Sequence, residues 1–169
     1  MKKTLLSLIV ITSLIACETK TNTATNSYPA NAAGYNLDSS DNIVTTKKAI
    51  EAGLISDTAT AKLCYEDTAT VYDNQNKQTI AESMQVANTF KSKGVTFKLE
   101  NINAIWEGVK NTEDELGVKN YVSVYFTASI SKGDKKVVVG FNAIFAFKNG
   151  KIIREWDTYD TAPIMELLK

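Results

Sequence analysis

The sequence predicts an α+β fold in which helices come first and antiparallel strands follow. Apolar residues recur at helical spacing between residues 43 and 92, and they alternate with polar residues from Val95 onward. An Asn149-Gly150 pair separates the last two alternating segments, which is typical of a tight β-hairpin turn. The 169 residues suffice for one such domain with a tail.

The composition excludes several classes of function. The 19 basic and 19 acidic side chains cancel, which argues against a nucleic-acid partner. The chain has no histidine, so histidine-based catalysis and histidine-ligated metal sites are excluded. Its 2 cysteines can form neither a disulfide framework nor a four-cysteine zinc site. Since a phosphate-binding loop and a dinucleotide motif are also missing, we predict no cofactor and no metal.

Residues 1–16 have the form of a signal peptide. Lys2 and Lys3 precede an apolar run of about 13 residues, which is shorter than the roughly 20 residues of a membrane-spanning helix. The segment Leu14-Ile15-Ala16-Cys17 resembles the bacterial lipobox, whose cysteine is lipidated and becomes the new N-terminus. The resemblance implies a lipoprotein of the bacterial cell envelope, anchored to a membrane through Cys17 and facing the periplasm or the cell surface. A secreted protein cleaved elsewhere is the alternative.

Residues 17–42 are predicted to be a flexible tether that begins at lipidated Cys17. The segment is rich in Thr, Asn, Ser and Ala and has few large apolar side chains. It therefore buries too little surface to offset the entropy of ordering. Tyr28, Tyr35 and Leu37 could instead dock on the following domain.

Three helices and a short strand open the domain. Asp41 or Asn42 can cap the first helix, and Ser56 or Asp57 can cap the second. Residues 69–72 are a short strand, and a third helix is predicted over roughly 77–92. An apolar stripe on this third helix is predicted to pack in the core and comprises Ile80, Met84, Ala87 and Phe90.

The second half of the domain is predicted to be an antiparallel meander. Residues 95–109, 121–130 and 137–147 alternate between apolar and polar side chains. The charged loop 110–119 is predicted to be a solvated hairpin tip, because it lacks the spacing of a calcium loop. A turn at residues 133–134 leads into the next strand.

The hairpin around Asn149-Gly150 carries the candidate site. A two-residue type I′ turn pairs Phe147 with Ile152 and Asn142 with Asp157. A β-bulge would shift these pairs by one residue. On the unshifted register the apolar face comprises Phe141, Phe145, Phe147, Ile152 and Trp156, and the mixed face comprises Asn142, Glu155, Asp157 and Tyr159. The mixed face is either a solvent face or the floor of a ligand pocket.

This order of elements resembles the nuclear transport factor 2-like superfamily. Residues 149–160 contain a Gly-Lys-Ile, Trp-Asp and Asp pattern that looks like the end of its SnoaL-like polyketide cyclase branch, and residues 66–73 look like that branch's first strand. The resemblance covers residues 43–169. It implies a cone-shaped, curved antiparallel sheet wrapped around three N-terminal helices, with an internal cavity.

The resemblance also implies a candidate site. In enzymatic members of the family, an acidic residue of the pocket moves a proton next to a carbonyl group. Asp157 best matches that position, Asp160 is second, and the histidine that often joins the acid has no counterpart here. Asn142 could orient Asp157 by hydrogen bonding. The candidate ligand-contacting residues are Tyr72, Trp106, Trp156, Tyr159 and Asp160.

More ordinary roles for these residues stay open. Asp157 could be a strand residue that faces solvent or pairs with Arg154. The tryptophans Trp106 and Trp156 could be core residues. Tyr72 could end in an ordinary hydrogen bond.

Three functions remain possible on the sequence alone. The first is a lipid-anchored domain that binds a small apolar or amphipathic molecule, which predicts a cavity larger than about 300 Å³. The second is an isomerase, cyclase or dehydratase that relies on Asp157. The third is a non-catalytic interaction domain that forms a homodimer through its sheet. The composition favours binding, because aromatic residues are plentiful and catalytic pairs are scarce.

Overall fold

The computed structural model describes residues 35–169. The signal peptide, the lipobox with Cys17 and the first part of the predicted tether lie outside the described residues. The helices are α1 (Asp41–Ile55), α2 (Thr58–Cys64), α3 (Ile80–Ser92) and α4 (Ala162–Leu168). The strands are β1 (Tyr35–Leu37), β2 (Tyr65–Asp73), β3 (Asn76–Thr79), β4 (Val95–Val109), β5 (Asn120–Lys132), β6 (Lys135–Lys148) and β7 (Lys151–Tyr159).

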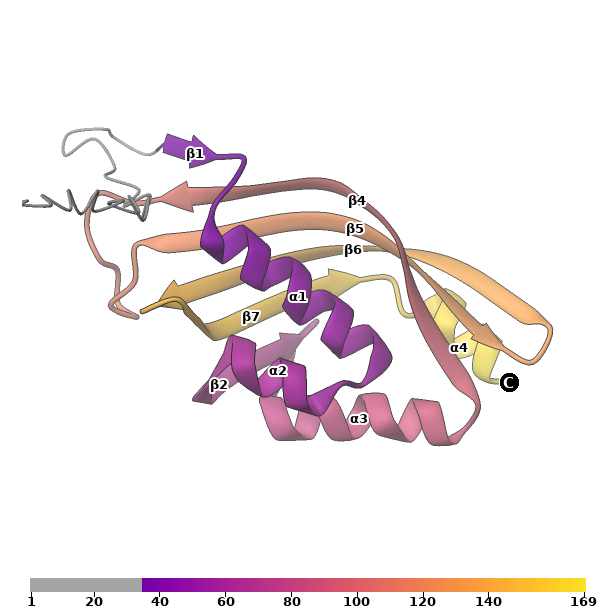
Figure 1. Cartoon of the computed structure of the whole chain (residues 1–169). Coiled ribbons are helices and arrows are strands. Elements are labelled where there is room, and N and C mark those ends of the chain that lie inside the picture. The colour runs from indigo at the N-terminus through magenta and orange to yellow at the C-terminus, as the bar shows by residue number, and fades with distance from the viewer. Residues whose placement is uncertain (1–34) are drawn as a thin grey trace, which may run out of the picture. The chain divides into compact units, whose positions relative to one another are not determined.

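The strands form one mixed sheet in the order β1-β4-β5-β6-β7-β2-β3. Helices α1, α2 and α3 lie on one side of this sheet, and the long strands β4, β5 and β6 bend along their length (Figure 1). All neighbouring strands are antiparallel except β2 and β7, which run parallel. The predicted α+β fold with a curved sheet behind three N-terminal helices is therefore confirmed.

Side-chain caps set where the helices begin. The Ser40 side chain, and not the predicted Asp41 or Asn42, accepts a hydrogen bond from the backbone N–H of Ile43 at 3.1 Å and starts α1. Asp57 caps α2 in the same way. Thr79 and Glu82 form a capping box, so α3 begins at Ile80, three residues later than the predicted start.

Three short elements were not predicted, because each depends on a distant partner. Strand β3 replaces the predicted first turn of α3 and pairs with β2. Strand β1, which lies within the predicted tether, pairs with β4. Helix α4 follows Asp160 and buries Ile164 and Leu167. Segments this short carry too little periodicity to be recognised. Pairing in the sheet stabilises β1 and β3, and burial of apolar side chains stabilises α4.

The turn between β6 and β7 has the predicted conformation. Asn149 and Gly150 both have positive φ, at 52° and 75°. The pairing of Phe147 with Ile152 is also as predicted. A β-bulge follows this pair, because Ala146 pairs with Arg154 and the residue between Ile152 and Arg154 has no partner.

The bulge overturns the rest of the predicted register. Asn142 pairs with Thr158, and Asp157 pairs with Ala143. Because side chains alternate along a strand, a shift of one residue moves each of them to the other face. Asp157 therefore lies on the covered face of the sheet, while Trp156 pairs with Ile144 on the opposite face.

The core lies between the helices and the covered face of the sheet. Phe145, Ile130 and Ile152 are its largest fully buried apolar side chains. One carboxyl group is buried there too: Glu107 Oε1 accepts hydrogen bonds from Asn42 at 2.7 Å and Asn120 at 2.6 Å. These two bonds tie the start of α1 to β4 and β5.

Two glycine variants are expected to have opposite effects on stability. Gly150→Ala should lower the free energy of unfolding by about 1 kcal/mol, because a β-carbon is strained at positive φ. Gly53→Ala within α1 should raise it by about 0.5–1 kcal/mol through helix propensity. Neither added β-carbon would meet another atom within 4 Å, so both effects are conformational. Urea denaturation measures them, and a shift of both variants in the same direction would contradict the backbone assignment.

Candidate functional site

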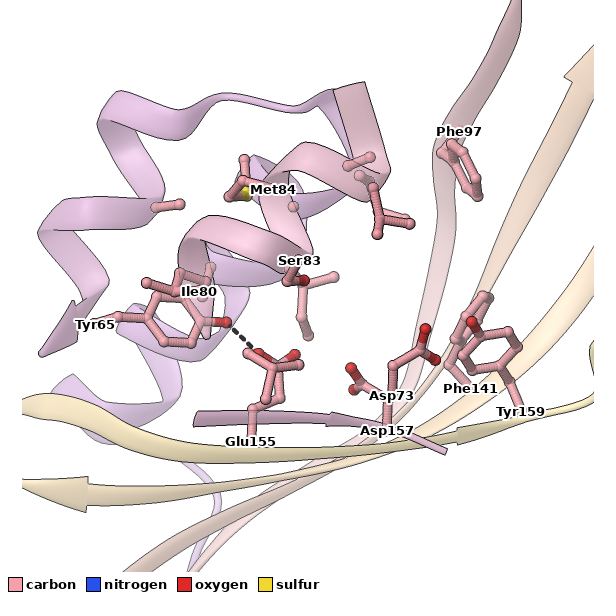
Figure 2. Close-up of a pocket in the computed structure, with 18 of the residues that line it drawn as sticks. Tyr65, Asp73, Ile80, Ser83, Met84, Phe97, Phe141, Glu155, Asp157 and Tyr159 are labelled. Carbon is pink, nitrogen blue, oxygen red and sulfur yellow. Dashed lines mark hydrogen bonds between the residues drawn. The ribbon is translucent and has the colours of Figure 1, made fainter. Parts of the chain in front are cut away.

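A cavity of about 180 Å³ lies between α1, α3 and the covered face of the sheet. Its walls are mainly apolar, and Figure 2 shows carboxyl groups at the strands and the α3 side chains opposite them. Val86 of α3 lines the cavity and is also 42% exposed, so the cavity reaches the surface beside this helix. Apolar wall residues include Ile50, Leu54, Met84, Phe90, Phe97 and Phe141.

Three carboxyl groups converge at the sheet side of the cavity. Glu155 and Asp157 alternate along β7 and therefore project from the same face. Asp73, at the end of β2, is the direct neighbour of Asp157 in the parallel β2–β7 pair. Figure 2 shows these three side chains in one row. The site thus combines adjacent strands that are 84 residues apart in the chain.

Glu155 and Asp157 form an interacting pair. Burial is the main cause that raises the pKa of Glu155. Burial, followed by the charge of Glu155, raises the pKa of Asp157 well above its ordinary value. Two neighbouring carboxyl groups in an apolar site resist ionising together, so this pair tends to retain a proton at neutral pH.

Two tyrosines complete the polar side of the cavity. The Tyr65 hydroxyl donates a hydrogen bond to Glu155 Oε2 at 2.6 Å. Burial raises the pKa of Tyr65 and Tyr159, so both hydroxyls stay protonated. The carboxyl group of Asp73 also raises the pKa of Tyr159. The Tyr159 ring packs on Phe141, with 4.6 Å between the ring centroids.

The residue that follows Asp73 holds β2 and β7 together at the site. Asn74 has a left-handed backbone with a φ of 52°. Its N–H donates to the carbonyl of Asp157 at 2.9 Å, and its side-chain Oδ1 accepts from the N–H of Tyr159 at 3.2 Å. These bonds keep the carboxyl groups of Asp73 and Asp157 on neighbouring positions.

Of the predicted catalytic and ligand-contacting residues, the structure places two in the cavity wall, Asp157 and Tyr159. Asn142 is exposed and pairs with Thr158, so it does not face Asp157 as predicted. The physical reason is the β-bulge. It moves the Asp157 side chain to the other face of the sheet and leaves the turn at Asn149 and Gly150 unchanged. Asp160 is exposed, and its carboxylate accepts a hydrogen bond from the N–H of Ala162 at 2.9 Å.

The other predicted ligand contacts gather on the opposite face of the sheet. Tyr72 stacks on Trp156 with 6.1 Å between the ring centroids. The Arg154 guanidinium lies 5.7 Å from the centroid of the Tyr72 ring and 5.6 Å from that of Trp156. Trp106 is 41% exposed. None of the three aromatic residues lines the cavity.

Sequence reasoning missed Tyr65 and Asp73 as site residues, and it placed Glu155 on the mixed face without deciding whether that face is covered. The alternation of Glu155, Asp157 and Tyr159 is a signal that all three share one face. It does not show which face is covered. Tyr65 and Asp73 belong to the site through the parallel pairing of β2 with β7, which no local pattern reveals.

The described part of the chain offers no metal site of ordinary type. Among residues 35–169, no three His, Cys, Asp or Glu side chains are arranged to hold a metal ion. In the same range, no helix has the length and apolar character needed to cross a bilayer.

No protein-family model matches the chain, and no curated protein sequence matches it significantly. Solved structures do match. A nuclear transport factor 2-like protein of unknown function from Burkholderia pseudomallei aligns at 14% identity with a TM-score of 0.58, over 78% of this chain and 99% of that one. A proposed polyketide cyclase from Pseudomonas putida aligns at 15% identity with a TM-score of 0.58, over 78% and 100% of the two chains.

An LEH-like epoxide hydrolase from M. tuberculosis is also similar, at 16% identity with a TM-score of 0.56, over 76% of this chain and 89% of that one. At such low identity these likenesses show the fold alone. The chain has the nuclear transport factor 2-like fold.

Proposed function

Starting from a nuclear transport factor 2-like fold with a carboxyl-lined cavity, we propose that this domain binds a small apolar or amphipathic molecule. The observation that carries the proposal is the cavity itself, which has apolar walls and polar groups concentrated on one side. Ligand sites in proteins usually have this division, in which apolar walls supply affinity and a few polar groups orient the ligand.

The size of the cavity matches an apolar ligand body of about one ring. A volume of about 180 Å³ is smaller than the roughly 300 Å³ expected from the sequence. An apolar protein cavity of about 150 Å³ is known to hold benzene. We therefore expect phenethyl alcohol to bind with a dissociation constant on the order of 1 mM.

Filling the cavity should weaken this binding. Ala87 lines the cavity from α3, so Ala87→Leu is expected to weaken phenethyl alcohol binding at least about tenfold. Ala81 lies on the exposed side of the same helix, and Ala81→Leu is the matched control. Isothermal titration calorimetry measures both. Equal affinities for the two variants would place the ligand elsewhere, and undetectable binding to the unmodified domain would contradict the proposal.

Proton transfer is a second candidate function, favoured by the carboxyl pair. Asp157 has a raised pKa inside the cavity, and this is the environment that makes a carboxylate an effective general base. Tyr65 and Tyr159 keep their protons and supply hydroxyl donors for developing negative charge. The Asp157→Asn variant tests this function, because it removes the candidate base.

We further propose that the domain is held at a bacterial membrane by lipid on Cys17. The support is the lipobox-like segment behind a short charged and apolar leader. Cys17→Ser is expected to release the protein into the soluble fraction, because the acyl chains that would bury in the bilayer are lost. Cell fractionation with immunodetection measures this, and Cys64→Ser is the matched control, since Cys64 is buried in the domain. Retention of the Cys17→Ser variant on membranes would contradict lipidation at this residue.

A further inference from the structure

The charges around the cavity all have one sign. Asp73, Glu155 and Asp157 line it, and no lysine or arginine is among the lining residues. The single arginine of the chain, Arg154, stacks on aromatic rings of the opposite face of the sheet. A ligand in the cavity therefore meets carboxyl groups that the protein does not neutralise with a basic side chain.

The polar groups of the cavity also have more acceptors than donors. Three carboxyl groups face the hydroxyls of Tyr65, Tyr159 and Ser83, and the Tyr65 hydroxyl is already used by Glu155. Asp73 Oδ1 is buried and has no hydrogen-bond partner. An unpaired buried acceptor is costly, and a donor on a bound ligand would remove that cost.

We propose that the cavity selects a primary amine in its protonated form, carried on an apolar body of about one ring. This inference rests on the proposed binding function and specifies the chemical class of its ligand. An ammonium group brings a positive charge and three donors, which match the carboxyl groups and the unpaired Asp73 oxygen. The apolar body lies against the aromatic and aliphatic wall that includes Met84, Phe97 and Phe141.

A carboxylate ligand with the same body is disfavoured for two reasons. It would add a further negative charge to the site, and it would bring no donor for Asp73. An alcohol brings one donor without charge. The expected order of affinity is therefore amine, then alcohol, then carboxylate, with the amine at least about tenfold tighter than the alcohol.

Three probes with one ring test this order on the unmodified domain: phenethylamine, phenethyl alcohol and phenylacetate. Titration calorimetry at neutral pH gives their affinities. NMR of selectively labelled methionine methyl groups shows where the probe binds, because Met84 lines the cavity and Met165 is 59% exposed on α4. We expect the amine to bind tightest and to shift the Met84 signal while the Met165 signal stays in place.

These measurements distinguish a failure of the amine preference from a failure of the proposed binding function. If the alcohol binds as tightly as the amine and shifts Met84, the choice of an amine is overturned and the binding cavity stands. If none of the three probes binds, the proposed function fails and the inference fails with it. Phenylacetate binding tighter than the amine would also overturn the inference.

Variants of β2 add a test at the level of one residue. Asp73→Asn is expected to remove most of the tenfold preference for the amine while the affinity for the alcohol changes less than about threefold. Asp67→Asn is the matched control, because Asp67 is exposed on the same strand. An unchanged preference in folded Asp73→Asn would contradict the role given to Asp73.

Discussion

Asp157→Asn is expected to raise the free energy of unfolding at neutral pH by about 0.5–2 kcal/mol, although it removes the candidate general base. Burial, and then the charge of Glu155, raises the pKa of Asp157 well above its ordinary value. Asparagine keeps the size of the side chain and has no charge to bury. The folded variant therefore avoids the cost of placing a second ionised carboxyl group beside Glu155.

The gain in stability should depend on pH in one direction. Because the pKa of Asp157 is raised, the folded protein holds this proton more tightly than the unfolded chain does. The contribution of Asp157 to stability is thus present below the unfolded pKa of about 4, and it is lost as the pH rises through the folded pKa. Urea denaturation at a series of pH values should show the largest difference between the two proteins at neutral and higher pH.

The rate of proton transfer should fall in Asp157→Asn, although the stability of the variant rises. A nitrobenzisoxazole opens when a base removes its ring proton, so any reaction that depends on the cavity carboxylates should be lost in Asp157→Asn. Asp134→Asn, at an exposed position between β5 and β6, is the matched control for both measurements.

If Asp157→Asn is less stable than the unmodified protein at neutral pH, the Asp157 carboxylate stabilises the fold, contrary to our expectation.

Phe145→Ala is expected to lower the free energy of unfolding by about 3–5 kcal/mol. Phe145 is fully buried on β6 and does not line the existing cavity, so truncation opens a new one. The cost then includes the lost transfer free energy of the ring and the contacts that its neighbours lose. Urea denaturation, with circular dichroism to confirm folding, measures the change.

The neighbouring residue is a close control for this variant. Ile144 is 43% exposed and points to the other face of β6. Ile144→Ala should therefore cost less than about 1 kcal/mol. Equal losses for Phe145→Ala and Ile144→Ala would mean that the covered face of the sheet has been assigned wrongly.

Much of the architecture could be predicted from local patterns. The capped helices α1 and α2, the apolar stripe of α3 and the alternation along β4, β5 and β6 all lie where their residues indicate. Each of these features depends on neighbours within a few residues, through capping bonds or the period of apolar side chains. Residues 149–150 were also sufficient to predict the turn, because positive φ at both positions favours Asn and Gly.

The site was predicted only in part. Of the predicted site residues, Asp157 and Tyr159 line the cavity, whereas Asn142, Tyr72, Trp106, Trp156 and Asp160 lie outside the cavity wall. For Asn142 and Trp156 the cause is the register of β6 and β7, which no sequence pattern decides. A bulge changes the face of every later residue while leaving composition and alternation as they were.

The sequence by itself determined the helices, the hairpin turn and the presence of acidic residues at alternating positions on the last strand. Only the tertiary structure decided that Glu155 and Asp157 face inward and that Asp73 lies beside them. The physical reason is the distance along the chain between the residues that interact. Capping and alternation are local, whereas the bulge in β7 and its parallel pairing with β2 are selected by how the whole sheet packs against its helices.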